Sequence, residues 1–325
     1  MQDKIAITLG DPAGIGPEIV GKSLPLLDGY LQRLILVGNK DNFISMGEKC
    51  GIDAKILRLP EFIDIPSPEI TMGRVQKAAG QVAMRSVEEA VDLWRSGKVS
   101  GISTAPISKE ALKLAGSADM DHTAMLSRLT GSGKVTTMFQ AGPLRTIFAT
   151  KHVPLRVAVS SITEEVVAGS IELADTSLKL LGSRRRKIAV AALNPHAGES
   201  GLLGTEERET ISPVIEKFKL MYDVQGPFPA DSVYHRAVNG EFDVVVSLYH
   251  DQGHIACKML DFEGTISMNP GLPFLRTSVD HGTAFDIAGK GIARERSMYL
   301  AIKYALEMSE TYESNFRSIF RNGTD

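Results

Sequence analysis

Short apolar runs rich in β-branched residues alternate along this chain with longer stretches whose apolar residues recur at helical spacing. The strand-like runs include KIAITLG, RLILVG, KIAVAAL and FDVVVSL, and the helical stretches include residues 73–97 and 164–181. Strands that are apolar at nearly every position are typical of a parallel sheet buried on both faces. The alternation therefore predicts an α/β fold in which helices cover both sides of a largely parallel sheet.

Local signals predict where several of these elements begin and end. One helix is expected to begin near Pro17, and two others are expected to follow the caps Ser108 and Thr163, because these residue types suit the start of a helix. The segments LRTIFAT and LRVAVSSI, on either side of His152, predict strands. A final helix is expected over about residues 293–308, followed by a frayed end.

Length and composition describe an ordinary globular protein. A chain of 325 residues can form one large α/β unit or two lobes. The net charge of −3 gives no reason to expect a nucleic-acid or membrane-surface partner. Two cysteines indicate a reducing compartment. No apolar run approaches membrane-spanning length, and charged residues interrupt the N-terminus too early for a signal peptide. We therefore expect a cytoplasmic protein.

The polar residues with the most chemical potential are concentrated in the segment Tyr249–Gly289, directly after FDVVVSL. This segment holds three of the seven histidines, a lysine, an arginine and a glycine-rich loop that ends in an acid. Ligands usually bind just past the carboxyl ends of strands in α/β sheets. We therefore expect the functional site to include this segment.

Three histidines follow predicted strands, namely His152, His196 and His250. If the strands are parallel, these side chains could point into one cleft, where three imidazoles could hold a divalent ion with a coordination position left open. The intervals of 44 and 54 residues (196 − 152 and 250 − 196) match no local metal motif. Structural histidines with hydrogen-bonded rings remain an alternative.

A second group of residues suits an anionic substrate. His122 and Thr123 lie at a predicted helix start, and Lys258 and Arg276 lie within the segment described above. A guanidinium fork and an ammonium group directed at one cavity suit a phosphate or a carboxylate. Lysine and arginine residues on a solvated surface are the competing interpretation.

Two glycine-rich turns are candidates for cofactor binding. GDPAGIGPE, which starts at Gly10, could direct backbone amides at an anion or could be a structural tight turn. It lacks the GxGxxG pattern of dinucleotide-binding folds. DHGTAFDIAG, which starts at Asp280, could surround an adenine and place a carboxylate on the ribose hydroxyls, which favours NAD over NADP. A loop that caps the last helix remains an alternative.

The motifs resemble those of known enzymes. HGTAFDIAGKGIA is similar to the cofactor loop of isocitrate and isopropylmalate dehydrogenases. TAPISKEAL, DHTAML, KHVPL, LNPHAGE, GTEE, PADS, YHDQG and GLPFLRTSVDHGTA follow the order found in 4-hydroxythreonine-4-phosphate dehydrogenases, the PdxA family of vitamin B6 synthesis. The resemblance extends from Gly10 to about Arg294.

The resemblance implies a role for each matching position. His152, His196 and His250 match the metal ligands, and one ligand comes from the partner subunit in that family, so a homodimer with shared active sites is implied. The substrate-binding positions match His122, Thr123, Lys258 and Arg276, with Ser267 where the family has asparagine. The cofactor positions match His281, Gly282, Thr283, Ala284, Asp286 and Ile287. A second departure is Asp121, where the family usually has glycine.

The resemblance also implies an activity and a fold. We expect oxidation, with decarboxylation, of 4-hydroxy-L-threonine 4-phosphate in pyridoxal 5'-phosphate biosynthesis, with NAD and one Zn, Mg, Co or Mn ion per site. Asp251, Asp231 and Lys258 are the candidate catalytic groups. The expected fold is an α/β/α sandwich of the isocitrate/isopropylmalate-dehydrogenase type with an interdomain cleft. The cofactor lobe is expected over residues 1–120 plus 283–325, and the metal, substrate and dimer lobe over residues 121–282.

Other functions stay open. A branch of the same family acts on 4-phospho-D-threonate or 4-phospho-D-erythronate, and YHDQGHI with His254 resembles that branch. The aromatic cis-dihydrodiol dicarboxylate dehydrogenases are less similar, because Arg276 is retained here. A phosphate acyltransferase would need neither the three histidines nor the HGTAFDIAG loop, and a ligand sensor without activity would not need the metal ligands.

Overall fold

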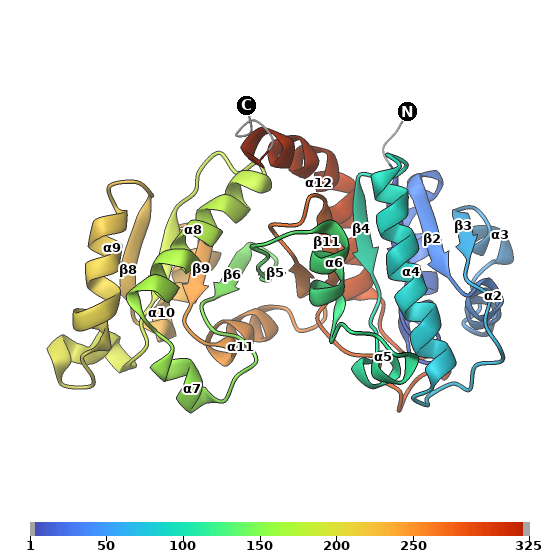
Figure 1. Ribbon diagram of the computed structural model, residues 1–325, viewed down its shortest axis with the longest axis horizontal. Helices are drawn as coiled ribbons and strands as arrows, with labels where there is room; N and C mark the ends of the chain where they lie inside the picture. Colours follow the sequence, from blue (N-terminus) through green and yellow to red (C-terminus); the bar gives the residue numbers. More distant parts are fainter. Residues whose placement is uncertain (1–3, 321–325) are drawn as a thin grey trace. The chain divides into compact units, whose positions relative to one another are not determined.

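A computed structural model describes residues 4–320 of the chain (Figure 1). The chain forms two compact units: unit 1 comprises Met1–Val135 and Ile266–Asp325, and unit 2 comprises Thr136–Thr265. The fold is mixed α/β, as the alternation of elements predicts. Within the described residues, no helix is both long enough and apolar enough to span a membrane.

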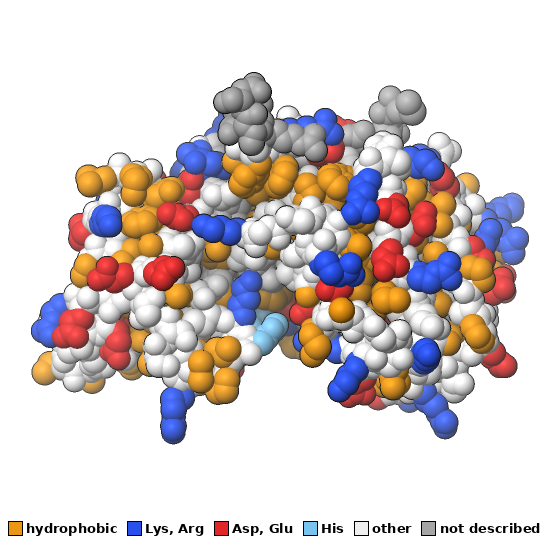
Figure 2. All heavy atoms as spheres, in the orientation of Figure 1, with side chains coloured by type: hydrophobic (Ala, Val, Ile, Leu, Met, Phe, Trp, Pro, Cys, Tyr) orange, Lys and Arg blue, Asp and Glu red, His pale blue; other side chains and the backbone are white. Residues whose placement is uncertain are grey.

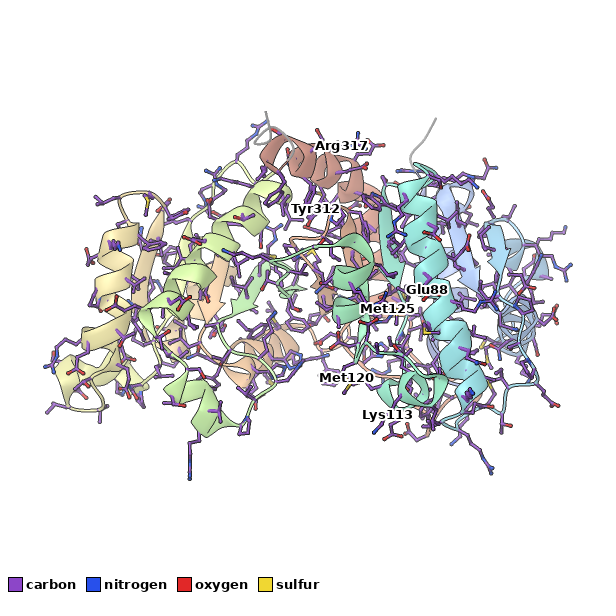
Figure 3. All side chains as sticks on the ribbon, in the orientation of Figure 1. Glu88, Lys113, Met120, Met125, Tyr312 and Arg317 are labelled. Carbon is purple, nitrogen blue, oxygen red and sulfur yellow. The ribbon has the colours of Figure 1, made fainter. Side chains whose placement is uncertain are left out.

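The unit boundaries differ from the expected division at residues 120 and 283. Residues 121–135 and 266–282 belong to unit 1. The first segment contains α6 (His122–Thr130), which packs against α4 (Lys77–Arg95) through Met125 and Leu126 (Figure 3). The second segment contains β10 and β11, and β11 pairs with β4. Core packing therefore moves the first division from residue 120 to residue 135, and strand pairing moves the second from residue 283 to residue 266.

The sheet of unit 1 has the strand order β3-β2-β1-β4-β11-β10, in which only the β10–β11 pair is antiparallel. The strands are β1 (Ile5–Thr8), β2 (Leu34–Gly38), β3 (Glu61–Asp64), β4 (Gly101–Thr104), β10 (Ile266–Met268) and β11 (Leu275–Val279). Every residue of the four central strands is buried. The prediction of strands covered on both faces is thus confirmed for unit 1.

Successive side chains of β1 pack into different core clusters. Ile5 and Ile7 join the cluster that includes Ile19 of α1 and Ile302 of α12, whereas Ala6 joins the cluster beneath α4. This alternation follows from the two-residue repeat of a strand. The helices of unit 1 are α1 (Gly16–Ser23), α2 (Lys40–Lys49), α3 (Ala54–Leu57), α4, α5 (Lys109–Ala115), α6 and α12 (Arg296–Phe320), with short 3-10 turns η1 (Leu24–Leu27) and η2 (Leu31–Arg33).

Unit 2 has a five-stranded sheet of order β5-β6-β9-β7-β8, which is parallel apart from the β5–β6 hairpin. Its strands are β5 (Met138–Ala141), β6 (Leu144–Phe148), β7 (Ile188–Ala191), β8 (Val224–Phe228) and β9 (Val244–Ser247). Its helices are α7 (Leu155–Ser160), α8 (Glu164–Leu180), α9 (Ser212–Phe218), α10 (Ala230–Val238) and α11 (His250–Leu260), with the irregular turn η3 (Pro195–Gly201) and the π-helical turn η4 (Glu207–Ile211). The strands β6, β7 and β9 are parallel, so their carboxyl ends lie at the same edge of the sheet. The three candidate metal ligands follow these ends.

Several predicted helix starts are confirmed. Ser108 caps α5 by accepting a hydrogen bond from the Ala111 amide at 3.2 Å, and Thr163 caps α8 by accepting from the Val166 amide at 3.3 Å. Pro17 lies in the first turn of α1. Side-chain caps of this kind satisfy backbone donors that have no partner within the helix.

Two predictions about elements are wrong. The segment LRVAVSSI forms helix α7 rather than a strand, because β5 and β9 already occupy both edges of β6 and leave no partner for another strand. The last helix does not end near residue 308: α12 continues to Phe320. Tyr312 is fully buried in this extension (Figure 3), and its hydroxyl donates to the Leu272 carbonyl at 3.0 Å, so the last turns are held by packing that the sequence pattern does not show.

Candidate functional site

Two of the predicted metal ligands lie close together in unit 2. His152 follows β6, and His250 is the first residue of α11, directly after β9. Their ring centroids are 5.4 Å apart, and both side chains line a surface pocket of about 230 Å³ that Tyr249 and Asp251 also line. Because β6 and β9 are adjacent parallel strands, their carboxyl ends bring the two imidazoles together.

His254 extends this group by one helical turn. Its ring centroid lies 4.7 Å from that of His250 and 5.0 Å from that of Phe139. In the sequence, His254 is a mark of one family branch and is not a predicted ligand, although its spacing of four residues from His250 places both on one side of a helix. Lys258 follows after four more residues, and its ammonium lies 4.8 Å from the centre of the Phe262 ring.

His196 follows β7, a third strand of the unit 2 sheet. It lies in η3, after β7, and its side chain is exposed. Within residues 4–320, no three His, Cys, Asp or Glu side chains are arranged to hold a metal ion. The assignment of His152, His196 and His250 as ligands of one ion therefore stays a prediction.

Buried polar side chains fix the strand ends that lead to these histidines. The Gln252 carboxamide accepts from the Leu248 amide at 2.7 Å and donates to the Ala192 carbonyl at 2.6 Å, so it joins the ends of β9 and β7. The Thr150 hydroxyl donates to the Leu248 carbonyl at 2.8 Å, which joins the end of β6 to the same point. Buried hydrogen bonds of this kind restrict where the following loops can start.

The Glu207 carboxylate fixes the loop that carries His196. It is almost completely buried, and its Oε1 accepts from the backbone amides of Leu193 at 2.8 Å and Asn194 at 2.7 Å. Its Oε2 accepts from Nδ2 of Asn194 at 2.9 Å. The loop itself is unusual, because five successive residues from His196 to Ser200 have positive φ angles between 41° and 77°. Four of them are not glycine, so the surrounding contacts must hold this conformation.

The candidate catalytic groups differ in their contacts. Asp251 Oδ1 lies 2.7 Å from Nδ1 of His250, which is the arrangement that orients an imidazole and leaves its other nitrogen available. The Asp251 side chain is 73% exposed. Asp231 lies in the first turn of α10 and is exposed. The contact of Asp251 with His250 supports an orienting role, while the role of Asp231 stays a prediction.

Unit 1 contains a buried polar cluster around Arg276, which is only 5% exposed. Its Nε and Nη2 donate to Oγ1 of Thr104 at 3.1 and 2.6 Å, and its Nη1 donates to Oδ1 of Asn269 at 2.6 Å. Nδ2 of Asn269 in turn donates to Oγ1 of Thr123 at 3.2 Å. Two predicted substrate-binding residues, Thr123 and Arg276, are thus brought together by a residue that sequence analysis does not identify.

Burial changes the proton affinity of two groups in this cluster. Desolvation lowers the pKa of Arg276 to about 10, although the Asp121 carboxylate opposes the change. Desolvation, followed by the charge of Arg276, lowers the pKa of His122 well below its usual value. His122 is therefore neutral at neutral pH, and its buried Nε2 has no hydrogen-bond partner in the described structure. A buried cation beside neutral donors is suited to an anionic ligand.

Asp121 and Ser267, the two departures from the family pattern, both form hydrogen bonds within unit 1. Asp121 caps α6, because its Oδ1 accepts from the Ala124 amide at 3.0 Å. An acid at this helix terminus also faces the positive end of the helix dipole. The Ser267 hydroxyl donates to the Val279 carbonyl at 3.4 Å, so it is directed at the neighbouring strand.

The predicted cofactor loop packs against the GDPAGIGPE turn of unit 1. The Ile15 amide donates to the Thr283 carbonyl at 3.0 Å, and a Cβ on Gly14 would lie 2.9 Å from the Thr283 side chain. The Glu18 carboxylate accepts from the Ala293 amide at 2.7 Å. The turn thus acts as a scaffold for the loop, and the role of the loop in binding NAD stays a prediction.

Asp11 lies in the same turn and is not among the predicted site residues. Asp11 is fully buried, and its Oδ1 accepts from the Ala13 amide at 2.8 Å while its Oδ2 has no hydrogen-bond partner in the described structure. Burial raises its pKa to about 6, and the Ala13 amide opposes this change. A buried carboxyl with one unsatisfied oxygen is destabilising unless a ligand completes it.

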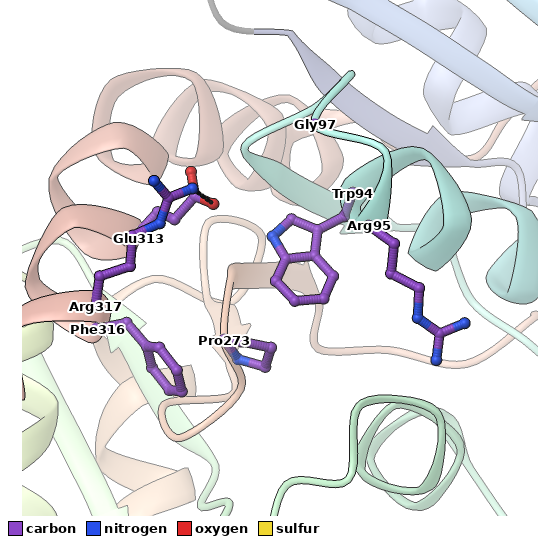
Figure 4. A pocket seen from close by; sticks show the side chains of 7 residues that line it. All are labelled: Trp94, Arg95, Gly97, Pro273, Glu313, Phe316 and Arg317. Atoms are coloured by element: carbon purple, nitrogen blue, oxygen red, sulfur yellow. Dashed lines mark hydrogen bonds and ion pairs between the residues drawn. The ribbon is translucent and has the colours of Figure 1, made fainter. Parts of the chain in front are cut away.

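A second pocket lies away from the predicted site residues. A pocket of about 320 Å³ in unit 1 is lined by residues of α4 and α12 together with Gly97 and Pro273 (Figure 4), and none of the predicted site residues lies in it. Both signs of charge are interspersed over the face shown in Figure 2. Apolar side chains gather over α7, where Val153, Leu155 and Val157 are exposed.

The chain is similar to known proteins over most of its length. Residues 35–305 match the family described as "Pyridoxal phosphate biosynthetic protein PdxA". A protein of Halalkalibacterium halodurans, named "Putative D-threonate 4-phosphate dehydrogenase", is 45% identical over 318 residues, which cover 93% of this chain and 95% of that protein. A protein of the same name from Fusobacterium nucleatum is 44% identical over 338 residues, which cover 98% of this chain and 100% of that protein. The solved structure of 4-hydroxythreonine-4-phosphate dehydrogenase from Klebsiella pneumoniae is 37% identical, has a TM-score of 0.84, and covers 94% of this chain and 99% of its own.

Proposed function

Because the chain belongs to the PdxA family of dehydrogenases, we propose that it oxidises D-threonate 4-phosphate, with NAD as the hydride acceptor and a divalent metal ion in the site. The sequence motifs favour 4-hydroxy-L-threonine 4-phosphate as the substrate. The relatives with the D-threonate name are 44 and 45% identical to this chain, whereas the solved structure with the hydroxythreonine name is 37% identical. This difference supports the sugar acid as the substrate and leaves the amino acid as the second candidate.

The buried cluster around Arg276 is the observation that most strongly supports a phosphorylated substrate. Within residues 4–320, Arg276 forms no ion pair with a carboxylate. A guanidinium that has lost its water and donates to no carboxylate gains most from an oxyanion. Thr123 and His122 would add neutral hydrogen-bonding groups around the phosphate.

The imidazoles of unit 2 fit a divalent ion, although one chain supplies only part of the set. His152 and His250 would be two ligands, and Asp251 would hold the His250 ring so that its Nε2 faces the ion. A bound divalent ion lowers the pKa of a coordinated hydroxyl and holds it in place. We propose that His196 of the partner subunit completes the set, as the family resemblance implies.

The residues of this chain would orient the substrate and move its proton. Lys258, on the same side of α11 as His250, would hold the carboxylate, and a neighbouring base would take the proton of the C3 hydroxyl. NAD, when bound, would supply the hydride acceptor, so that removal of the hydride from C3 and of the hydroxyl proton by the base would give a β-keto acid and NADH. Carbon dioxide would then leave from C1 of the keto acid, and the electron pair left at C2 would take up a proton. Asp251 would act by orienting His250, and Asp231 is a candidate for the base.

A homodimer follows from this proposal. Apolar side chains on α11 are exposed close to the histidines, with Ile255 at 60% and Met259 at 81%. Leu155 on α7 is 61% exposed. Exposed apolar side chains near a site favour an interface with another subunit.

The substrate assignment can be tested by measuring NADH formation with D-threonate 4-phosphate, D-erythronate 4-phosphate and 4-hydroxy-L-threonine 4-phosphate. We expect the highest kcat/KM for D-threonate 4-phosphate and no measurable oxidation of unphosphorylated D-threonate. A higher kcat/KM for the hydroxythreonine compound would replace the first candidate with the second. Efficient oxidation of unphosphorylated D-threonate would contradict the role given to Arg276.

A further inference from the structure

We propose that Asn269 is a positioning residue that holds Arg276 and Thr123 so that their remaining hydrogen-bond donors face one oxyanion. The inference rests on the proposed function, because it assigns a residue to the phosphate end of that site. Asn269 is fully buried and follows β10. Its backbone amide donates to the Arg276 carbonyl, so the two residues face each other across the antiparallel β10–β11 pair.

The chemistry of the neighbours fixes the orientation of the Asn269 carboxamide. Arginine only donates hydrogen bonds, so the oxygen of the carboxamide must face Nη1 of Arg276, at 2.6 Å. The amide nitrogen must then face Oγ1 of Thr123, at 3.2 Å. Thr123 accepts this hydrogen bond, and its own hydroxyl hydrogen is therefore left for another acceptor.

The same arrangement leaves donors on Arg276. A guanidinium has five N–H groups, and three of them are used here: two with Thr104 and one with Asn269. One N–H on Nη1 and one on Nη2 remain, which is the pair that binds two oxygens of a phosphate in a fork. Thr104 cannot rotate freely, because its hydroxyl also donates to Oγ of Ser278 at 3.0 Å.

The residues around the proposed oxyanion therefore offer donors from Arg276 and Thr123, and Asn269 turns no acceptor toward it. The carboxamide is the side chain suited to this task, because it accepts from one neighbour and donates to the other. An aspartate in its place would accept from both. The Thr123 hydroxyl would then donate to the aspartate, and the charge of Arg276 would be neutralised.

The substitution Asn269→Asp separates this role from a structural one. We expect inorganic phosphate, measured by titration calorimetry, to bind the variant at least about thirtyfold more weakly, because one donor and the net positive charge are lost together. The melting temperature should stay the same or rise, because the buried guanidinium gains a counterion. With substrate, KM should rise more than kcat falls, since the phosphate lies away from the reacting carbon.

Two further variants complete the experiment. Asn239→Asp introduces the same charge at an exposed residue directly after α10, and phosphate affinity should stay within twofold of the unmodified protein. Asn269→Ser is too short to bridge the two neighbours but adds no charge, and it should weaken phosphate binding about tenfold with a lower melting temperature. If Asn269→Asp lowers the melting temperature, the phosphate affinity of Asn269→Ser tests the proposal instead. An unchanged phosphate affinity of Asn269→Ser would contradict the proposal.

The experiment distinguishes this inference from the proposed function. Phosphate that binds the unmodified protein and the Asn269→Asp variant equally well would refute the role of Asn269, whatever the enzyme oxidises. Failure of the unmodified protein to bind phosphate would also refute it. Loss of phosphate binding in Asn269→Asp, combined with no oxidation of any 4-phosphorylated hydroxy acid, would support the inference and refute the proposed function.

Discussion

The polar clusters of units 1 and 2 are built in different ways. In unit 1, Arg276 and His122 are 5 and 8% exposed, and hydrogen bonds between neighbouring strands hold the guanidinium. In unit 2, the side chains of His250 and Asp251 are 29 and 73% exposed, and the histidines lie on loops and a helix start after strand ends. The first cluster is fixed by the sheet itself, and the second depends on the segments that follow the sheet.

This difference indicates what each cluster can do without a ligand or a partner. A buried cation fixed by the sheet offers an anion a preformed site, and its cost in desolvation is already present in the folded protein. Half-exposed imidazoles can receive a further ligand from another chain. We therefore expect substitutions in unit 2 to act mainly through the assembly of the metal site, and substitutions in unit 1 to act mainly through buried charge.

The largest effect is expected for His196→Ala. Loss of one of three proposed ligands should reduce bound metal and kcat by more than about a hundredfold, because even residues that only orient ligands change metal affinity by about 10–100-fold. NAD affinity should stay nearly unchanged, since the predicted cofactor loop lies in unit 1. Metal content by mass spectrometry and NAD titration test these expectations, with His235→Ala, an exposed histidine of α10, as the control.

Mixing two inactive variants sharpens this test. If His196 of one subunit completes a site with His250 of the other, dimers of His196→Ala and His250→Ala chains carry one intact site. About a quarter of the activity should return after subunit exchange, because half of the dimers are mixed and each has one of two sites intact. No recovery after confirmed exchange would show that all the ligands come from one chain or that His196 is not a ligand.

The second prediction concerns buried charge in unit 1. The pKa of Asp11 is about 6 in the folded protein against an ordinary value of 3.8. A raised carboxyl pKa means that ionisation destabilises the folded state: the cost is absent below about pH 4, grows toward pH 6 and is complete above it. The advantage of the Asp11→Asn variant over the unmodified protein in free energy of unfolding should therefore increase by up to about 3 kcal/mol from about pH 4 to about pH 8.

Urea unfolding of the variant and of the unmodified protein, at about pH 4 and at about pH 8, measures this increase. Asp28→Asn, at an exposed residue of unit 1, is the matched control. A gain that is the same at both pH values would show that the Asp11 carboxylate is not desolvated. It would also weaken the contrast between buried charge in unit 1 and exposed charge in unit 2.

The third prediction tests an exposed position in unit 1. A carboxylate at Asp286 that accepts hydrogen bonds from the ribose hydroxyls should disfavour NADP by roughly a hundredfold, because a 2'-phosphate would place one anion against another. Asp286→Lys should raise kcat/KM for NADP and lower it for NAD. Asp41→Lys makes the same change in charge at another exposed residue of unit 1. Equal kcat/KM for NAD and NADP in the unmodified enzyme would contradict the assignment.

The sequence predicts some features of this molecule well, for physical reasons that differ between elements. Strands such as β2 and β7 are apolar at nearly every position, and helix caps such as Ser108 and Thr163 act through their immediate neighbours, so local patterns suffice for both. Helix α7 is missed because Val157 and Val159 favour a strand locally, whereas the occupied edges of β6 are a property of the whole sheet.

The site shows the same distinction between local and long-range information. The spacing of His250 and His254 on one helix can be read from the sequence. The contact of Asn269 with Arg276 depends on the register of β10 against β11, and the burial of Asp11 depends on packing around the turn. Neither can be derived from residue types alone, because both depend on segments that are distant in the chain.

The smallest effect is expected for Glu207→Gln, which changes the support of the His196 loop and no proposed ligand. The glutamine oxygen can still accept from the amides of Leu193 and Asn194, but its NH₂ group would face Nδ2 of Asn194, which is also a donor. The Asn194 amide cannot turn over without cost, because its Nδ2 also donates to the Glu206 carboxylate at 2.7 Å. One buried hydrogen bond is therefore lost, at a cost of about 1–3 kcal/mol.

His196 follows Asn194 by two residues in a loop of positive φ angles. We therefore expect the lost hydrogen bond to leave the His196 side chain less well ordered. Metal affinity should fall about tenfold, while phosphate affinity, which depends on the Arg276 cluster of unit 1, should not change. Glu209→Gln, at an exposed residue of the same π-helical turn, is the matched control. Equal metal affinity in Glu207→Gln and the unmodified protein would show that the sheet alone fixes the His196 loop, and the contrast between the two units would then disappear.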